Sequence, residues 1–315
     1  MKLAVAGLTD DEIAILDGHW TESPPAAQVV LQLARRLTVA PHEVTAADVD
    51  TLRPHYNDAQ ITELVYAVAR FNSVNRWTDA LGLPQDRQFA GKPLQLNTPT
   101  SPEYADRVSR VIPSRMLSRP PLESREAVEA ALAECRQREP LVKLPGEDEG
   151  RQLLPTKHTG TSVPSWVRAL AVFPETGAVQ VAAIKAIEEQ GELSPVVRAK
   201  IAWVVARENR AWYALGQAQR RLHALGLDDD AIFALDELDV ERPEAERVVH
   251  AFARKLTVFP HSMTDEDIKG LQEHFNDIEV AQIVYVIATA NMFDRFTEAL
   301  QLPLSDDMSI VTSGS

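Results

Sequence analysis

Apolar residues recur along this chain at the 3.6-residue spacing of amphipathic helices, and no stretch alternates convincingly in the manner of a strand. After Asp58, for example, Ile61, Leu64, Val65 and Val68 fall on one helical face. The expected helices cover residues 24–39, 58–81, 124–138, 174–190, 195–225, 243–258 and 277–300, with shorter ones after Thr45 and Thr264. Aspartate caps also predict a helix in each of the stretches 7–16 and 226–235. The pattern therefore predicts an all-α protein.

Two parts of the chain repeat each other. Residues 7–84 align with residues 226–303 at a constant offset of 219 without a gap, and 35 of the 78 paired positions are identical. An ungapped repeat of this length predicts the same helical arrangement in both copies. The first copy has no counterpart to residues 153–219, so it is expected to lack the front half of the module and to begin in the middle of a helix.

The repeat divides the chain into three expected parts. Residues 1–89 form an N-terminal partial module, and residues 153–315 form a complete C-terminal module. Residues 90–152 are rich in proline and serine and are predicted to be a linker with one helix.

Charge and cysteine content narrow the possible functions. The formal net charge is −14, from 46 acidic and 32 basic side chains, which disfavours nucleic acid and anionic membranes as partners. The longest uncharged apolar run, residues 280–293, is too short to span a bilayer, and the N-terminus lacks a signal-peptide core. A cytoplasmic protein is therefore expected. The single cysteine, Cys135, excludes an intramolecular disulfide.

The stretch 206–218, "ARENRAWYALGQA", places a stripe of alanines beside a dense polar cluster. Ala211, Ala214 and Ala218 are three and then four residues apart, so on a continuous helix they would share one face. A stripe of small side chains is common where two helices pack closely, and that interpretation stays open at this point.

The longer stretch 193–232 resembles the carboxymuconolactone decarboxylase and alkylhydroperoxidase D-like family. Eight residues fall in register with the family pattern: Leu193, Ser194, Pro195, Arg198, Asn209, Tyr213, Gly226 and Leu227. The resemblance covers residues 153–303 as one module and residues 1–84 as the rear half of another. It implies an alkylhydroperoxidase D-like all-α fold and, for active members, peroxiredoxin-type reduction of hydroperoxides by two cysteines, with a glutamate and a histidine that shuttle protons.

The resemblance also implies that the reactive groups are missing here. The glutamate position falls on Ala199, the two cysteine positions on Ala211 and Ala214, and the histidine position on Ala218. Alanine supplies no nucleophile, proton donor or metal ligand. The chain is therefore interpreted as a degenerate relative with a binding or structural role. The alternatives are an error of register, or an active hydroperoxide reductase or decarboxylase-like enzyme that uses other residues.

Other polar residues are candidates for binding. A ligand site beside the alanines would use Arg207, Glu208, Arg210, Trp212 and Tyr213, although a salt-bridged internal interface would use the same residue types. Asn72 and Arg76 recur as Asn291 and Arg295, either to bind a carboxylate or to form a buried link between helices or protomers.

The remaining candidates are weaker. The arginines beside Cys135 could favour a one-cysteine peroxidase, and a structural thiol is the other interpretation. The recurring histidines His42, His55, His261 and His274 lack the spacing of a helical metal site, so no metal and no cofactor are expected. Expected partners are a second copy of the chain or a related paralogue, with a small-molecule ligand possible.

Overall fold

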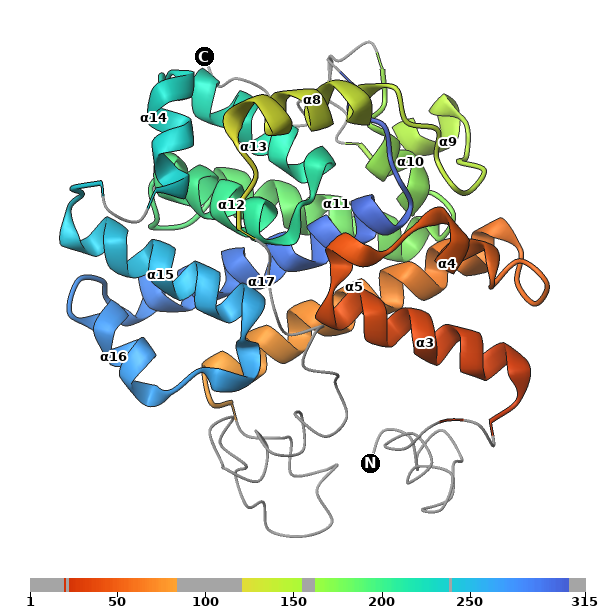
Figure 1. Ribbon diagram of the computed structural model, residues 1–315, viewed down its shortest axis with the longest axis horizontal. Coiled ribbons are helices and arrows are strands. Elements are labelled where there is room, and N and C mark those ends of the chain that lie inside the picture. The colour runs from red at the N-terminus through yellow and green to blue at the C-terminus, as the bar shows by residue number, and fades with distance from the viewer. Residues whose placement is uncertain (1–19, 21–22, 84–120, 155–161, 238–239, 306–315) are drawn as a thin grey trace, which may run out of the picture.

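Two long helices, α5 (Asp58–Ala80) and α17 (Asp277–Ala299), lie side by side at the centre of the molecule (Figure 1). The computed structural model describes residues 20, 23–83, 121–154, 162–237 and 240–305. Within these residues all regular structure is helical, so the all-α prediction is confirmed. The predicted helix near residue 10, the start of the chain and residues 90–120 lie outside the described residues.

The helices of the two repeats begin at the same offset of 219 that the sequence shows. Helix α3 (Pro25–Val39) corresponds to α15 (Glu244–Val258), and the 3-10 turn η1 (Pro41–Glu43) corresponds to η4 (Pro260–Ser262). The N-termini of α4 (Ala46–Asp50) and α16 (Asp265–Gln272) correspond as well, and α16 is the longer.

Identical capping residues explain why these boundaries agree. Thr45 and Thr264 each form a capping box with an aspartate three residues later, at α4 and α16. Asn57 and Asn276 accept backbone N–H groups at the starts of α5 and α17. The signals that start the helices are therefore local, and both repeats carry them.

The two repeats hold each other through a reciprocal pair of buried arginines. Arg76 on α5 donates from Nε to the carbonyl of Leu256 at 3.2 Å and from Nη2 to the carbonyl of Thr257 at 3.1 Å. Arg295 on α17 donates to the carbonyls of Leu37 and Thr38, at 3.0 and 3.1 Å.

Residues 37 and 38 are the counterparts of 256 and 257, so each arginine makes the same contact with the opposite repeat. Asn72 and Asn291 also repeat each other, since each accepts from its own arginine and donates to a threonine at 2.9 and 3.0 Å. The predicted buried link between helices is what the structure shows.

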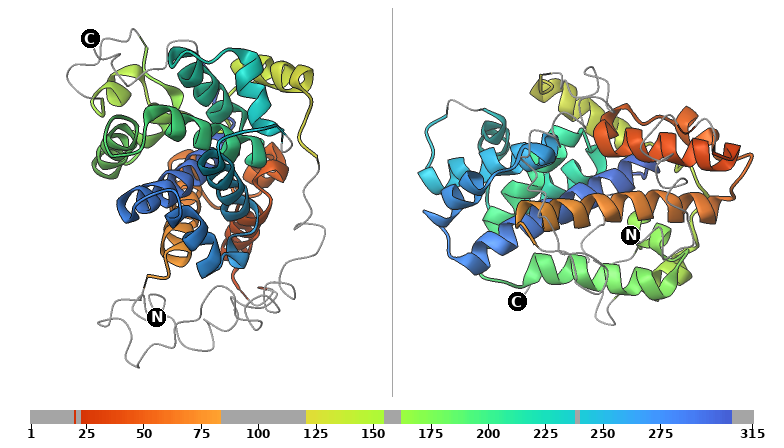
Figure 2. Two further views of the ribbon diagram at one scale, coloured as in Figure 1. Left: turned by 90° about the vertical axis from the view of Figure 1, so that its left-hand side faces the viewer. Right: turned by 90° about the horizontal axis from the view of Figure 1, so that it is seen from below.

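A second set of helices covers the C-terminal repeat (Figure 2). Its members are α10 (Ser165–Leu170), α11 (Pro174–Glu189), α12 (Pro195–Asn209) and α13 (Trp212–Ala224). The C-terminal repeat itself begins with α14 (Asp229–Phe233) and the 3-10 turn η3 (Ala234–Asp236). Helices α12 and α13 both pack on α17. The sequence did not predict α10, which is a short helix of six residues.

Residues 121–154 differ from the predicted linker. They contain α8 (Arg125–Arg136) and an additional short helix, α9 (Glu147–Arg151). Val128, Leu132 and Cys135 on α8 are buried, and the carbonyl of Cys135 accepts from the N–H of Leu304 at 3.1 Å. This part of the chain is packed into the core, since the apolar face of α8 covers α13 and the segment after α17.

None of the helices within the described ranges combines the length and the apolar character needed to cross a membrane.

Candidate functional site

The predicted helix 195–225 is two helices with a sharp corner between them, so the prediction of one continuous helix is wrong. Helix α12 ends at Asn209, and Arg210 adopts a left-handed conformation with φ of 50°. Helix α13 then starts at Trp212, with Ala211 as its N-cap residue. The sequence concealed this corner because a left-handed residue is usually glycine or asparagine, and here it is an arginine.

The corner changes where the alanines lie. Ala211 stands at the amino end of α13, Ala214 lies in its first turn, and Ala218 lies one turn further on. Ala199 lies on α12, which packs against α13. All four are buried, with exposed fractions of 0%, 0%, 7% and 2% for Ala199, Ala211, Ala214 and Ala218. The stripe therefore lies in the interior, where its methyl groups offer packing and no chemistry.

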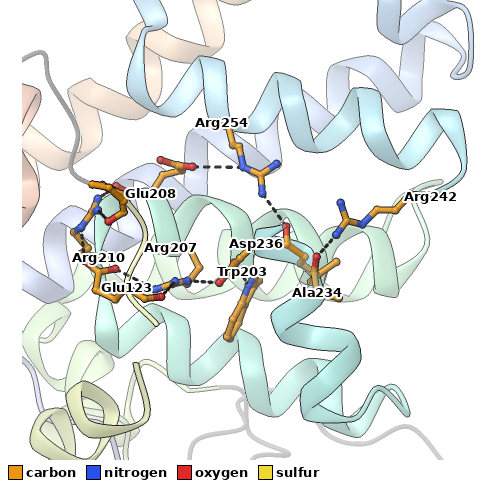
Figure 3. A network of polar contacts seen from close by, with 11 residues as sticks. Glu123, Trp203, Arg207, Glu208, Arg210, Ala234, Asp236, Arg242 and Arg254 are labelled. Carbon is orange, nitrogen blue, oxygen red and sulfur yellow. Dashed lines mark hydrogen bonds and ion pairs between the residues drawn. The ribbon is translucent and has the colours of Figure 1, made fainter. Parts of the chain in front are cut away.

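A network of ion pairs surrounds the corner on its outer side (Figure 3). Arg207 is 1% exposed and donates from Nε to Asp236 at 2.7 Å and from Nη2 to the carbonyl of Glu123 at 2.7 Å. Asp236 also accepts from the indole nitrogen of Trp203 at 2.9 Å. Burial raises the pKa of Asp236, although Arg207 and Trp203 partly offset that effect. The network joins η3, α12 and the chain before α8.

The left-handed Arg210 belongs to the same network. Its Nε donates to Glu123 at 2.7 Å, and its Nη2 donates to the carbonyl of Pro121 at 3.0 Å. A left-handed conformation costs an ordinary residue about 1–2 kcal/mol, and these charge-assisted bonds hold it in place. On the other side of α12, Glu208 lies 3.5 Å from Arg254 of α15. The sequence pattern does not reveal Glu123, Asp236 or Arg254, because the shortest separation from their ion-pair partners is the 29 residues between Arg207 and Asp236.

These contacts bear on the predicted ligand site. The structure brings Arg207, Glu208 and Arg210 together, but their charged groups engage Glu123, Asp236 and Arg254 within the chain. Tyr213 is fully buried, its ring lies 5.9 Å from that of Phe293, and burial raises the pKa of its hydroxyl. Trp212 is partly buried against the core. This arrangement is typical of an internal salt-bridged interface, which was the other interpretation of the cluster.

Two enclosed carboxyl groups lie on α17 behind the corner, the buried Asp294 and the largely buried Glu298, and the sequence pattern predicted neither. Asp294 is 2% exposed and accepts from Asn209 Nδ2 at 2.9 Å. Glu298 accepts from the backbone N–H of Tyr213 at 3.0 Å, and its other oxygen pairs with Arg138 at 2.9 Å. Glu298 therefore supplies the cap that Ala211 cannot give to α13.

Burial is the main cause of the unusual ionisation of this pair. It raises the pKa of Asp294 to about 8, against weaker opposing effects from the Asn209 hydrogen bond and the charge of Arg295. Burial also raises the pKa of Glu298, although Arg138 and the N–H groups of α13 favour its charged form. Asp294 is thus neutral at pH 7, and Asn209 joins it to the buried link residue Asn291 at 3.2 Å.

Cys135 lies apart from the four alanine positions, on α8. It is fully buried, its Sγ is 3.8 Å from the carbonyl of Leu302, and burial raises the pKa of its thiol to about 11. The charges of Arg138 and Arg136 lower this pKa, but they do not offset the effect of burial. The structural interpretation of this thiol agrees with its surroundings.

The recurring histidines do not converge on a metal site. His42 and His261 lie in the equivalent turns η1 and η4, and burial lowers the pKa of His261. Within the described ranges, no group of three or more His, Cys, Asp or Glu side chains is placed to hold a metal ion.

Comparison with known proteins gives a likeness in structure and none in sequence. No family model matches the sequence, and no curated protein matches it. The chain is similar to the crystal structure of an alanine variant of the debrominase Bmp8 in complex with 2,3,4-tribromopyrrole. The likeness covers 59% of this chain and 91% of that chain, with a TM-score of 0.43 and 15% sequence identity. The family resemblance at residues 193–232 thus stays an interpretation of the sequence.

Proposed function

We propose that this chain is a catalytically silent protein on a carboxymuconolactone decarboxylase and alkylhydroperoxidase D-like scaffold, with a binding or structural role. One observation carries the proposal: Ala199, Ala211, Ala214 and Ala218 occupy the reactive positions of the family pattern and are all buried. On the same interpretation, residues 1–84 are a duplicate of the rear half of the module, and the expected partner is a second copy or a related paralogue.

The position of Ala211 supports this interpretation. A cysteine at the amino end of a helix has a lowered pKa, because the helix dipole and the free N–H groups stabilise the thiolate. Ala211 lies at such an end, and Ala214 follows in the first turn. In this chain the N–H of Tyr213 is instead engaged by Glu298. The amino end of α13, which would stabilise a thiolate, thus carries the methyl group of Ala211, and the carboxyl group of Glu298 binds its free N–H.

The single thiol does not replace the missing pair. With a pKa of about 11, roughly one Cys135 in ten thousand is ionised at pH 7, and the thiolate is the nucleophile in peroxide reduction. The side chain is also fully buried, so a hydroperoxide cannot reach it without local opening.

Hydroperoxide consumption tests the proposal. The purified chain is mixed with hydrogen peroxide or an organic hydroperoxide and a dithiol reductant, and the rate is compared with that of the heat-denatured protein. We expect no turnover above this background. Turnover that disappears in the Cys135→Ser variant would contradict the proposal and indicate a one-cysteine mechanism.

Asp294 favours a second candidate, an enzyme with decarboxylase-like proton transfer and no thiol chemistry. A carboxylic acid with a pKa of about 8 holds a proton at neutral pH and can act as a general acid. Its 2% exposure and its bond to Asn209 favour a structural role instead. The test is a screen of small lactone and β-keto acids for decarboxylation, in which activity lost in Asp294→Asn would select the enzyme.

A further inference from the structure

The repeats create two equivalent grooves between α5 and α17, and one of them is covered. In the covered groove the ring of Tyr66 on α5 lies 5.8 Å from that of Phe296 on α17. Helix α11 closes this groove: Phe173 at its start lies 5.0 Å from Tyr66, and Gln180 Oε1 accepts from the Tyr66 hydroxyl at 3.0 Å. Figure 2 shows α11, in green, along this side of the central pair.

The equivalent groove on the other side is open. Tyr285 and Trp77 are the counterparts of Tyr66 and Phe296, and their rings lie 5.2 Å apart in the same edge-to-face manner. This groove is lined by Trp77, Asp277, Ile278, Ala281, Gln282 and Tyr285. Ile278 is 56% exposed and Tyr285 is 39% exposed, so a largely apolar hollow faces outward here. We call it the Trp77–Tyr285 groove.

Helix α11 accounts for the difference. It precedes the C-terminal repeat, yet it contacts Tyr66 of the N-terminal repeat. By the same reciprocity that relates Arg76 and Arg295, a helix placed in the same way before the N-terminal repeat would reach Tyr285. None of the described helices is such a counterpart of α11. The Trp77–Tyr285 groove is therefore the place that a second α11 would occupy.

We propose that the Trp77–Tyr285 groove binds a helix equivalent to α11 that is supplied by a different protein, because this chain's own α11 is engaged by Tyr66. The covered groove defines the chemistry of that helix. It begins with an aromatic residue and proline, as Phe173 and Pro174 do, and carries an amide side chain seven residues after the aromatic residue, as Gln180 does. The aromatic ring packs on Tyr285, and the amide accepts from its hydroxyl.

The groove also has a polar end for the partner. About two turns before Tyr66 on α5, Asp58 accepts from the backbone N–H of Lys143 at 2.7 Å. Its counterpart Asp277 lines the open groove and has one oxygen engaged by Gln272 at 3.0 Å. A docking segment can therefore give a backbone N–H to Asp277, as Lys143 gives one to Asp58. This inference does not depend on whether the chain is catalytically silent.

A peptide of this chain's own α11 tests the proposal. The probe is a fluorescent peptide of residues 172–190, which contains Phe173, Pro174 and Gln180, titrated with the full-length protein and followed by anisotropy. A matched control peptide carries Phe173→Ala and Gln180→Ala. We expect saturable binding of the first peptide and at least about tenfold weaker binding of the control, since an anchor side chain at an interface dominates its affinity.

Protein variants locate the binding. Ile278→Asp places a charge in the open groove, and about a tenfold loss of affinity is expected. Val179→Asp is the matched control, because Val179 is 70% exposed on the outer side of α11 and lies outside the groove. Both positions are exposed, so both variants should melt like the parent.

Three results would overturn the proposal. The first is the absence of saturable binding to the folded protein, and the second is binding that Ile278→Asp leaves unchanged. The third is evidence that something else fills the groove. If Ile278→Asp converts a dimer to a monomer in light scattering, a second copy fills it. If a glycine-serine replacement of residues 84–120 exposes it to the peptide, the chain covers its own groove.

Discussion

Helices α5 and α17 have the same length, the same type of N-cap and the same arginine, but they lie in different surroundings. Helix α17 is enclosed by α12, α13 and α15, whereas no counterpart of α12 or α13 packs on α5 among the described helices. The consequence is visible after each helix: Leu302 is fully buried and its counterpart Leu83 is 44% exposed. Comparing α5 with α17 therefore distinguishes the residues needed for the contact between the repeats from the residues needed for packing against α12 and α13.

The residues that differ follow that division. Asn72 and Arg76, which serve the contact between repeats, are kept as Asn291 and Arg295. One turn away, Asn75 and Asp79 are exposed, and their counterparts Asp294 and Glu298 are enclosed by α12 and α13. At the first pair the acid occurs only in the C-terminal repeat, where Asn209 of α12 donates to Asp294. At the second pair both residues are acids, and Glu298 accepts from the backbone N–H of Tyr213.

The largest effect is expected from removing the buried arginine of the C-terminal repeat. Arg295→Ala leaves the carbonyls of Leu37 and Thr38 without donors and opens a cavity, at a cost of about 3–5 kcal/mol of unfolding free energy. Arg76→Ala should cost a similar amount, because the carbonyls of Leu256 and Thr257 that it leaves without donors belong to buried residues. Urea unfolding measures both losses, and a loss below about 1 kcal/mol for either variant would contradict a reciprocal link.

The next effect concerns pH and Asp294. Its pKa is raised from 3.8 to about 8 in the folded chain, so between these values the folded state keeps a proton that the unfolded state releases. The stabilising contribution is complete below about pH 4 and is lost as the pH rises through about 8. Asp294→Asn should therefore stabilise the protein by roughly 2–4 kcal/mol at pH 9 and change little at pH 4.

Two comparisons isolate that effect. Burial lowers the pKa of His250 to about 4, so its effect makes the unfolding free energy rise with pH between about pH 4 and 6.5. This contribution is the same in the parent and in Asp294→Asn, so it cancels in their difference. Asn75→Asp, at the exposed counterpart, should stay within about 0.5 kcal/mol of the parent at every pH. Melting curves from pH 4 to 9 would refute the assignment if Asp294→Asn followed the parent throughout.

A smaller difference is expected at the two leucines that follow the central helices. Leu302→Ala removes a fully buried side chain and should cost about 2–3 kcal/mol. Leu83→Ala, at the same place in the other repeat, should cost less than about 1 kcal/mol because Leu83 is partly exposed. Similar losses of unfolding free energy for the two variants in denaturant unfolding would mean that Leu83 is as well packed as Leu302.

The smallest effect is expected where the family side chains are restored. The variant with Ala211→Cys, Ala214→Cys and Ala218→His should melt close to the parent if a scaffold built for larger groups retains room for them. In a tight helix–helix contact, each insertion would cost about 1–3 kcal/mol. Thermal melts distinguish the two, and collapse to an aggregated chain would establish ordinary close packing.

The sequence predicted the repeats well because their signals are local. The caps Thr45, Asn57, Thr264 and Asn276 and the regular apolar spacing mark the helices, and the constant offset carries one repeat onto the other. The corner at Arg210 escaped prediction because the residues that hold it, Pro121 and Glu123, lie 89 and 87 positions away.

The buried acids escaped prediction for a related reason. An acid within an apolar helix is usually on its solvent face, and only the distant partners of Asp294 and Glu298 show otherwise. Asn209 is 85 residues from Asp294, and Arg138 is 160 residues from Glu298. The packing of residues 121–154 against the core escaped prediction for the same reason. A proline-rich composition does not indicate which distant helices a segment contacts.

The reciprocal arginines also impose an order of events during synthesis. Arg295 lies 258 residues after Leu37, whose carbonyl it binds. At about 5–20 residues per second, a ribosome needs roughly 13–50 seconds to add that much chain. During this interval the first repeat has emerged but its carbonyls have no guanidinium to bind, and α5 has no α17 beside it. The N-terminal repeat is thus the part of the nascent protein with the longest need for protection by chaperones.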